Sequence, residues 1–318
     1  MKLARIFLSC FCFTFFVLPA LAQKEDWLPV TQQDLEIKQV PGGAGADAIQ
    51  LYYADYINDV EHYEFFYHRI KVLNEKGNRH ADVEIVLPVD GSFSSLKART
   101  IHPDGKITEF IGKPFQKVLV KGRGIKVLAK TFTMPDVTVG SIIEYKYKIN
   151  QGGIFIDNAW TIQHELYTVK ESFRMKPYVG LLEGFPGGYQ VAAIYSHMPN
   201  NIKPVQKGGG YELEVENMPA FETEGYMPPE DDFKPQMRFF YVGRDVSTTE
   251  KFWKDVGERG NTWTERFIGN RKEISQAAAE AIGNETDPEQ KLRKLYARAQ
   301  QIRNLTYERE RTEQEQKQ

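Results

Sequence analysis

The stretch Ile142-Ile143-Glu144-Tyr145-Lys146-Tyr147-Lys148-Ile149 is the clearest structural signal in this chain of 318 residues. Apolar and charged residues alternate along it, and successive side chains of a β-strand point to opposite faces of a sheet. The alternation predicts a strand that buries Ile143, Tyr145, Tyr147 and Ile149. On the other face, Glu144, Lys146 and Lys148 are expected to face water.

Similar segments recur on both sides of this strand, between residues 50 and 217. Runs rich in aromatic and β-branched residues, such as 63–73, 81–87 and 190–195, are separated by turns such as Pro103-Asp104-Gly105-Lys106. Many short strands with regularly spaced turns are typical of an antiparallel sandwich. The sequence therefore predicts an antiparallel β-sandwich-like domain.

After residue 247 the spacing of apolar residues becomes helical. Phe252, Val256, Trp263 and Phe267 fall on one face of a helix predicted from about Thr249 to Ile268. A second helix is predicted to end at Gly283, and a third to begin at Asp287-Pro288, a capping residue followed by proline at the first helical position. The predicted fold class is mainly β, with a short α-helical C-terminal segment after the β domain.

The first 22 residues have the pattern of a secretory signal peptide. Lys2 and Arg5 precede an apolar run over residues 6–18, and Ala20-Leu21-Ala22 fits a cleavage site before Gln23. The apolar run is shorter than the ~20 residues that a membrane-spanning helix needs. We therefore predict an exported protein, periplasmic or extracellular, with no transmembrane span after signal cleavage.

Charge and cysteine content exclude several classes of function. The chain has 41 Lys+Arg against 43 Asp+Glu, a net charge of −2, whereas nucleic-acid-binding proteins are usually basic. Both cysteines, Cys10 and Cys12, lie in the predicted signal peptide, so the mature chain has no cysteine nucleophile, disulfide or thiolate metal ligand. The sequence predicts no catalytic, cofactor-binding or metal-binding residue and no enzyme activity for the chain as it stands.

Other motifs are interpreted structurally. The six histidines (His62, His68, His80, His102, His164 and His197) match no zinc spacing, although His62 and His68 share strand parity with Glu64. The acidic run Glu230-Asp231-Asp232 is interpreted as a solvated linker, because it lacks the spacing of a known calcium loop. Lys207-Gly208-Gly209-Gly210 is interpreted as a hairpin turn. It is not a phosphate-binding loop, because no strand precedes it and no Gly-Lys-Ser or Gly-Lys-Thr motif follows.

Aromatic residues allow two interpretations that the sequence leaves open. They can line a sugar or peptide groove, or they can fill the core on one strand face and form cross-strand pairs on the other. The residues concerned are Tyr52, Tyr53, Tyr56, Tyr63, Phe65, Phe66, Tyr67, Phe239, Phe240 and Tyr241.

The order of several segments resembles a known bacterial family. These segments are the early tyrosine-rich strand, the turn His102-Pro103-Asp104-Gly105-Lys106, the stretch Phe132-Thr133-Met134-Pro135-Asp136-Val137-Thr138-Val139-Gly140-Ser141-Ile142-Ile143-Glu144-Tyr145, and the exit segments Asn217-Met218-Pro219-Ala220-Phe221 and Tyr226-Met227-Pro228-Pro229. Over about residues 50–318 the sequence resembles the family called domain of unknown function 3857. In that family the β domain is usually followed by a transglutaminase-like domain, and Leu292 to Tyr307 resembles the opening helix of that second domain.

The signal-peptide pattern, the shift in composition at Pro219 and the resemblance together predict a division of the chain into four parts. Residues 1–22 are the signal peptide, 23–218 the β domain, 219–246 a Pro-rich acidic linker plus a strand, and 247–318 the incomplete helical start of a transglutaminase-like domain. Papain-like folds of that kind use Cys as nucleophile, His as base and Asp as orienter. In the family these residues come after the point where this chain ends, so none is carried over, and we expect the chain to be a fragment of a longer protein.

Two hypotheses for function follow. In the first, the chain is an exported, non-catalytic β module that binds or positions substrate for, or packs against, a downstream transglutaminase-like domain with acyl-transfer or amide-hydrolysing chemistry. In the second, it is a free-standing binding protein for a cell-envelope glycan or peptide. The expected partners are its own downstream domain or a cell-envelope protein, peptide or glycan, and not nucleic acid. A metal-dependent hydrolase, a third class, would require stoichiometric metal in the purified protein.

Overall fold

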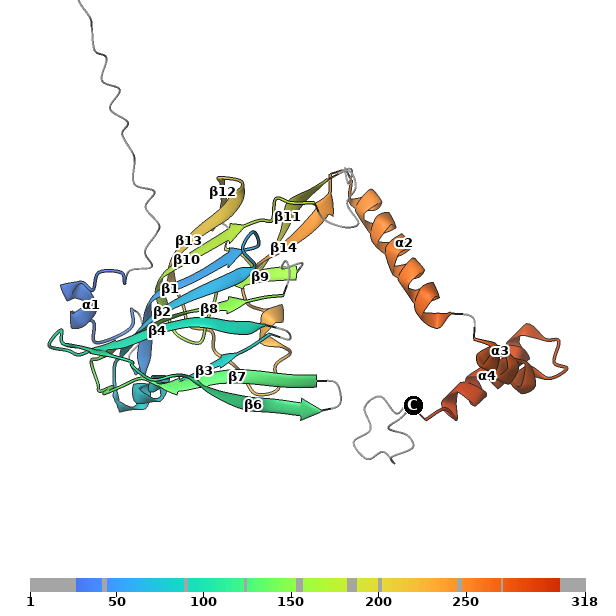
Figure 1. Ribbon diagram of the computed structural model, residues 1–318, viewed down its shortest axis with the longest axis horizontal. Helices are drawn as coiled ribbons and strands as arrows, with labels where there is room; N and C mark the ends of the chain where they lie inside the picture. The colour runs from blue at the N-terminus through green and yellow to red at the C-terminus, as the bar shows by residue number, and fades with distance from the viewer. Residues whose placement is uncertain are drawn as a thin grey trace, which may run out of the picture.

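The computed structural model describes residues 27–41, 45–88, 91–122, 125–152, 157–181, 188–199, 202–244, 248–269 and 271–303. The predicted signal peptide, residues 1–22, lies outside these ranges. The described chain forms a β domain followed by helices α2, α3 and α4 (Figure 1). The predicted fold class is confirmed, because the protein is mainly β with several antiparallel sheets and C-terminal helices.

An eight-stranded sheet forms the centre of the β domain. Across the sheet its strands are β12 (Val205–Lys207), β13 (Gly210–Met218), β10 (Thr168–Lys176), β1 (Ala48–Asn58), β2 (Tyr63–Val72), β8 (Ile142–Asn150), β4 (Ser92–Ile101) and β5 (Ile107–Glu109). Neighbouring strands are antiparallel except β1 and β10, which are parallel. The sequence predicted antiparallel pairing only. A parallel pair needs a long crossover, which the intervening strands supply here.

Two three-stranded sheets pack on one face of the large sheet. One has the order β3 (Asp82–Val86), β7 (Ile125–Thr133), β6 (Phe115–Gly122), and the other β11 (Tyr189–Ser196), β14 (Gln236–Gly243), β9 (Asp157–Thr161). Trp160 and Phe239 of the second sheet pack against Phe173 of the large sheet, and Phe132 of the first packs against Tyr145. This arrangement is a sandwich with an apolar core on each half.

Strand β14 extends the β fold beyond residue 218, the end predicted from composition. It pairs with both β11 and β9, and its Met237 and Phe239 are buried in the core. The intervening chain includes a short 3-10 helix, η2 (Glu230–Asp232), formed by the acidic run. We propose Gly243 as the end of the β domain.

The opposite face of the large sheet is covered at one end by the N-terminal segment. This segment contains α1 (Gln32–Glu36), which begins with a capping box in which Thr31 Oγ1 accepts a hydrogen bond from the Asp34 N–H. Beneath it lies a third apolar cluster that includes Ile49, Ile101 and Ile142. Elsewhere in the domain, a short 3-10 helix, η1 (Glu75–Ala81), follows β2. The described part of the N-terminal segment, residues 27–41, leaves the rest of this face open.

Strand β8 confirms half of the alternation predicted for it and contradicts the other half. Ile143, Tyr145, Tyr147 and Ile149 are buried in the sandwich, as predicted. Glu144 and Lys146 are not exposed to water, however, since their exposed fractions are 0% and 3%. Period-2 alternation assigns residues to two faces but does not say what covers each face, and here the N-terminal segment covers these two side chains.

The helices lie close to their predicted positions. They are α2 (Thr249–Ile268), α3 (Lys272–Ile282) and α4 (Pro288–Gln300). The Asp287 side chain accepts a hydrogen bond from the Gln290 N–H at 2.9 Å, and Gly283 has φ +60°, as expected for the cap residues. None of the helices in the described part of the chain combines the length and hydropathy needed to cross a membrane.

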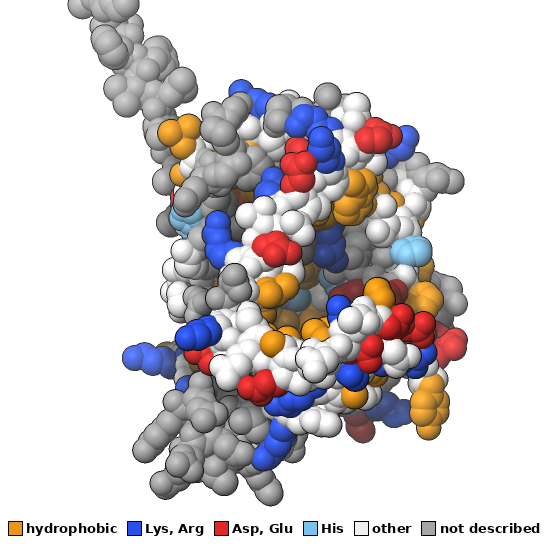
Figure 2. Space-filling model, turned by 90° about the vertical axis from the view of Figure 1, so that its right-hand side faces the viewer, with side chains coloured by type: hydrophobic (Ala, Val, Ile, Leu, Met, Phe, Trp, Pro, Cys, Tyr) orange, Lys and Arg blue, Asp and Glu red, His pale blue; other side chains and the backbone are white. Residues whose placement is uncertain are grey.

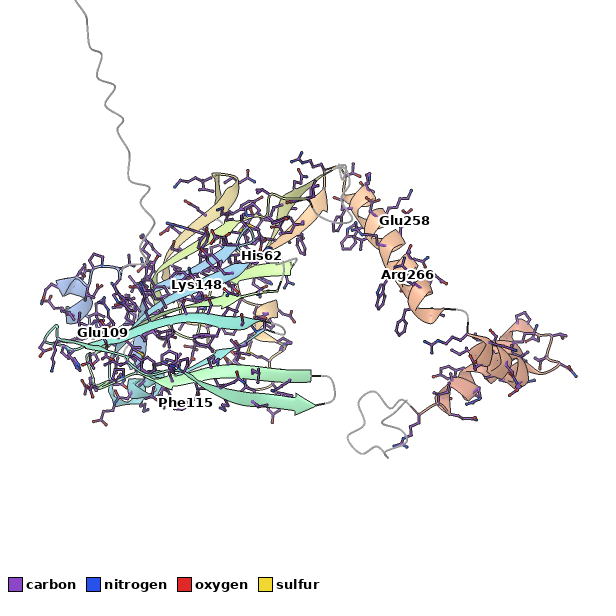
Figure 3. All side chains as sticks on the ribbon, viewed as in Figure 1. His62, Glu109, Phe115, Lys148, Glu258 and Arg266 are labelled. Atoms are coloured by element: carbon purple, nitrogen blue, oxygen red, sulfur yellow. The ribbon has the colours of Figure 1, made fainter. Side chains whose placement is uncertain are left out.

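The helical segment has little core of its own. None of the described residues of α2, α3 or α4 is buried, and Trp263 and Phe267 are 66% and 74% exposed. Hydrophobic side chains are visible among charged ones on the side of the molecule shown in Figure 2. Figure 3 shows side chains crowded between the sheets, whereas Glu258 and Arg266 project outward from α2.

We expect limited proteolysis to remove the helices first. Helices without buried residues open locally at low free-energy cost, whereas the sandwich opens only with its core. Trypsin treatment followed by mass spectrometry should leave a resistant fragment that ends near Arg244. Earlier cleavage within β1, β2 or β8 than within α2–α4 would contradict this expectation.

Candidate functional site

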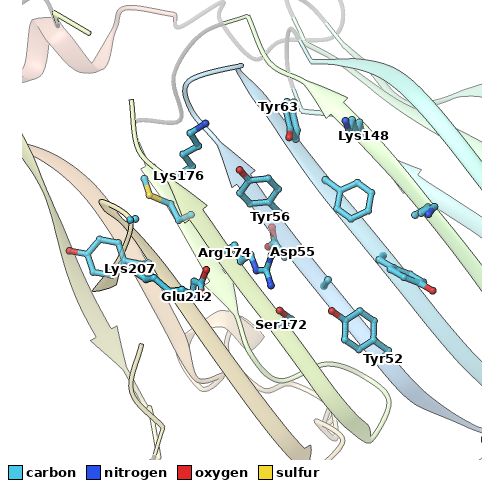
Figure 4. Close-up of a pocket in the computed structure, with 18 of the residues that line it drawn as sticks. Tyr52, Asp55, Tyr56, Tyr63, Lys148, Ser172, Arg174, Lys176, Lys207 and Glu212 are labelled. Atoms are coloured by element: carbon cyan, nitrogen blue, oxygen red, sulfur yellow. The ribbon is translucent and has the colours of Figure 1, made fainter. Parts of the chain in front are cut away.

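The uncovered face of the large sheet forms a groove of about 610 Å³. Its floor consists of parts of β13, β10, β1, β2 and β8, and the β12–β13 hairpin borders one side (Figure 4). The hairpin is the predicted Lys207-Gly208-Gly209-Gly210 turn, with Gly208 at φ +59° and Gly209 at φ +82°. The large sheet thus has a packed face against the small sheets and a second face that is open to a ligand.

Aromatic side chains line the groove because of strand parity. In β1, Tyr53 and Ile57 point into the core, so the alternating Tyr52 and Tyr56 point into the groove. The same alternation in β2 places Phe66 against the core. The rings of β1 and β2 that line the groove are Tyr52, Tyr56, Tyr63, Phe65 and Tyr67, and Tyr211 of β13 also lines it. Alternate aromatic residues therefore fill the core and line the groove, and a sugar or peptide as the ligand of the groove remains a prediction.

Basic side chains outnumber ionised acids along the groove. The cations are Lys146, Lys148, Arg174, Lys176 and Lys207. Of the two acids, Glu212 pairs with Lys207 at 3.1 Å, and the buried Asp55 has a pKa well above its usual range because of desolvation and the neighbouring Glu64. The groove is therefore positively charged, although the whole chain is slightly acidic.

The phenols of the groove are hydrogen-bond donors at neutral pH. Burial raises the pKa of Tyr52, and it raises the pKa of Tyr56 to about 12. Tyr56 and Tyr63 pack edge to face with ring centroids 5.9 Å apart, and Lys148 Nζ lies 4.5 Å from the centroid of the Tyr63 ring. The rings and cations therefore support one another on a rigid floor.

The N-terminal segment closes one end of the groove. The Trp27 ring lies 4.5 Å from Arg99 Cζ and 4.4 Å from Lys146 Nζ, both measured to its centroid. The Leu28 N–H donates to the Tyr67 hydroxyl at 3.2 Å, and Leu28 also lines the groove. Trp27 is therefore a natural fluorescent reporter of changes at this end of the groove.

A buried carboxylate holds this end together. Glu144 Oε1 accepts hydrogen bonds from Arg69 Nε at 2.8 Å and from the Tyr67 hydroxyl, and Glu144 Oε2 accepts from Arg99 Nε at 2.7 Å. The remaining Arg69 donors reach the carbonyl oxygens of Leu28 (2.6 Å) and Pro29 (3.0 Å). A buried charge needs such partners, since desolvation alone would make it strongly unfavourable.

The electrostatics of this cluster agree with its geometry. Burial opposes the charge of Arg69, but the adjacent Glu144 carboxylate outweighs it and raises the Arg69 pKa. Burial, together with Glu144, raises the Tyr67 pKa. The hydroxyl therefore stays protonated and donates a hydrogen bond to Glu144. Lys71, whose Nζ donates to the Leu35 and Gly140 carbonyl oxygens at 3.0 Å, has a pKa lowered by burial.

A second set of titratable groups lies inside the sandwich. Desolvation raises the pKa of Glu64 to about 7 and that of Glu171 to about 8, and it lowers the pKa of His164 to about 4. Neither Glu171 oxygen has a hydrogen-bond partner among the described residues, and the nearest His164 nitrogen is 3.9 Å away. Glu171 and His164 are therefore mostly uncharged at neutral pH, whereas Glu64 titrates near it.

Metal chemistry has no support in the described ranges. No group of three or more His, Cys, Asp or Glu side chains there has the geometry to hold a metal ion. His68 stacks on Tyr145 with centroids 4.6 Å apart, and His62 lies in the turn before β2. In the acidic run, Glu230 pairs with Lys234 at 2.5 Å.

The sequence matches a family model over residues 58–221. The family is described as a Domain of Unknown Function with solved-structure structure (DUF3857). The match covers more than half of the chain, and the protein belongs to this family. No curated protein matches the sequence.

A solved structure shares the fold at low sequence identity. The crystal structure of a putative protease from Parabacteroides distasonis ATCC 8503 superposes with a TM-score of 0.53 at 13% identity, over 80% of this chain and 50% of that protein. The chain thus spans about half the length of that structure, and the similarity shows a common fold alone. Yeast LTA4 hydrolase aligns over 74% of this chain and 36% of its own at 8% identity, but its TM-score of 0.31 carries no argument.

Sequence reasoning identified the rings of the groove but missed the charges. Glu144 and Lys146 were assigned to the solvent, and Arg69, Arg99 and Arg174 were not singled out. One signal was present: Arg69 and Lys71 alternate with apolar residues in β2 as Glu144 and Lys146 do in β8. Opposite charges on adjacent strands are the signature of cross-strand pairing.

We expect Glu144→Gln to destabilise the protein by about 3–5 kcal/mol, because two buried guanidinium groups lose their counter-ion. This corresponds to a decrease in Tm on the order of 10 °C, measurable by circular dichroism. As a control, Glu84→Gln breaks the exposed pair with Lys117 and should cost at most about 1 kcal/mol.

A second variant keeps this expectation testable if Glu144→Gln is insoluble. Tyr67→Phe removes a single donor to Glu144 and should cost about 1 kcal/mol. Equal stability of the Glu144→Gln, Tyr67→Phe and Glu84→Gln variants would contradict the role assigned to Glu144.

We expect Glu171→Gln to change the pH dependence of stability. The folded-state pKa of about 8 lies above the ordinary glutamate pKa of 4.5, so Glu171 contributes stability below about pH 4.5 that is lost as the pH rises through about 8. A glutamine side chain does not ionise, so the variant avoids the cost of a buried charge at high pH. The Tm of the variant relative to the natural protein should therefore rise between pH 5 and pH 9. The exposed Glu165→Gln is the surface control, and an identical pH profile for both variants would contradict the expectation.

Proposed function

We propose that this protein is an exported, non-catalytic binding module whose groove holds an extended ligand. The observation that carries the proposal is the open face of the large sheet, where aromatic rings and cations line about 610 Å³ of space. Binding sites commonly combine aromatic walls with a few convergent polar groups. The rings and cations of the lining support a binding role, and the lining serine, Ser172, donates a hydrogen bond to Glu214 at 2.7 Å.

We further propose that the module positions substrate for a transglutaminase-like domain that lies downstream in the natural protein. The fold shared with the larger Parabacteroides protein supports this arrangement, as do the exposed apolar residues of α2, which offer a surface for a further domain. The alternative is a free-standing cell-envelope binding protein. The native reading frame past codon 318 separates the two: continuation with a Cys, a His and an Asp supports the first, and a stop codon supports the second.

We expect Tyr56→Ala to weaken ligand binding without unfolding the protein. The test is a titration of the chain from Gln23 onward with a panel of neutral and charged oligosaccharides and peptides. The change in Trp27 fluorescence is the signal of binding. For a probe that binds, Tyr56→Ala should raise Kd by about tenfold or more, equivalent to about 1.4 kcal/mol.

The matched control is Phe115→Ala, an exposed aromatic truncation on β6, outside the groove. It should leave Kd unchanged, and Trp27→Phe should remove the fluorescence change without abolishing binding measured by calorimetry. Binding that Tyr56→Ala and Phe115→Ala affect equally, or no binding of any probe, would overturn the proposal.

A further inference from the structure

The order of side chains across the groove restricts the chemistry of its ligand. The strand registers place Arg174, Tyr56, Phe65 and Lys148 in one row that crosses β10, β1, β2 and β8. Adjacent strands are about 4.8 Å apart, so the two cations of the row stand about 14 Å apart at the backbone, with two aromatic rings between them. Figure 4 shows the labelled members of this row, Arg174, Tyr56 and Lys148, on their separate strands.

Arg174, the cation at one end of the row, is exposed, as is Lys176 two residues further along β10, and neither forms an ion pair with any residue that the structure describes. Lys148, at the other end of the row, is half-buried, with its Nζ 4.5 Å from the centroid of the Tyr63 ring. Glu212, the acid at the β13 end of the row, is paired with Lys207. A ligand that crosses the strands therefore meets a cation, two rings and another cation.

The backbone of the groove floor cannot pair with a peptide by strand addition. Strands β13, β10, β1, β2 and β8 all have a neighbour on each side, so their N–H and C=O groups are used in the ladders. Peptides that add to a sheet do so at an exposed edge, where main-chain groups are unpaired. Recognition on this floor depends on ring surfaces, hydroxyl groups and cations.

We propose that the groove binds an acidic oligosaccharide, a chain of sugar rings bearing carboxylate or sulfate groups. This inference rests on the proposed binding function and specifies its ligand class. Sugar rings pack their C–H faces on Tyr56 and Phe65, their hydroxyl groups bond with the tyrosine phenols, and their anionic groups pair with Arg174 and Lys148. Phenols that remain protonated at neutral pH match ligands rich in hydroxyl groups.

The experiment compares probes that differ in charge alone. Oligogalacturonate carries a carboxylate on each ring, and its fully methyl-esterified form has the same rings without charge. We expect oligogalacturonate, or sulfated dextran oligomers as the second anionic arm, to bind at least tenfold more tightly than the ester. The affinity should fall as salt rises, because exposed ion pairs are screened.

The variants Arg174→Gln and Lys148→Gln should each raise Kd for the anionic probe by about fivefold to tenfold. The control Lys126→Gln removes the same charge from β7, on a different sheet, and should leave Kd unchanged. Thermal denaturation of Arg174→Gln and Lys126→Gln should give Tm values close to that of the natural protein, since both side chains are exposed. Lys148→Gln also loses the contact with the Tyr63 ring and should lower the Tm only slightly.

Three results would overturn the inference about the class of ligand. None of them overturns the proposed binding function, which the Tyr56→Ala experiment tests separately. Equal binding of the methyl ester would show that charge is not recognised. Tighter binding of oligoglutamate than of both anionic oligosaccharides, with the same loss in Arg174→Gln, would assign the groove to acidic peptides. Failure of both anionic oligosaccharides to bind, while Tyr56→Ala abolishes binding of another probe, would leave a groove with a different ligand.

Discussion

The buried charge of Glu144 is the constraint on which the groove side of this protein depends. A carboxylate in the middle of an interior strand is tolerable only if neighbouring donors compensate it. Arg69 of β2 and Arg99 of β4 do so from both sides, and the remaining donors of Arg69 bind carbonyl groups of the N-terminal segment. The pairing therefore joins three strands and ties down the segment that closes the groove.

The two faces of the large sheet follow from one alternation. Residues of one parity pack against the two smaller sheets and exclude water. Glu171 on this face, and His164 next to it, are therefore mostly uncharged at neutral pH. Residues of the other parity keep their charges and hydroxyl groups. Since a shift of one residue in register would exchange the two faces, burial of the apolar face also determines the chemistry of the groove.

Charge is unevenly distributed in a way that suits a binding module. The chain as a whole carries a small negative charge, yet cations gather where the sheet is open. Such segregation attracts an anionic ligand to one face while the net charge stays low. The helices after Gly243 contribute no buried residue in the described chain, so the β domain alone accounts for the groove.

The sequence by itself determined the mainly β class, the strand over 142–149, the three helices with their caps, and the family. These features depend on local periodicity and on turn and cap chemistry, which neighbouring residues specify. Tertiary structure alone decided that β1 and β10 are parallel, that β14 completes a sheet with β9, and that Glu144 and Lys146 lie beneath Trp27. Each of these is a contact between residues far apart in the chain, and alternation along one strand contains no information about what covers its polar face. The same reason explains why the aromatic residues were recognisable as candidates while the groove, which needs five strands in order, was not.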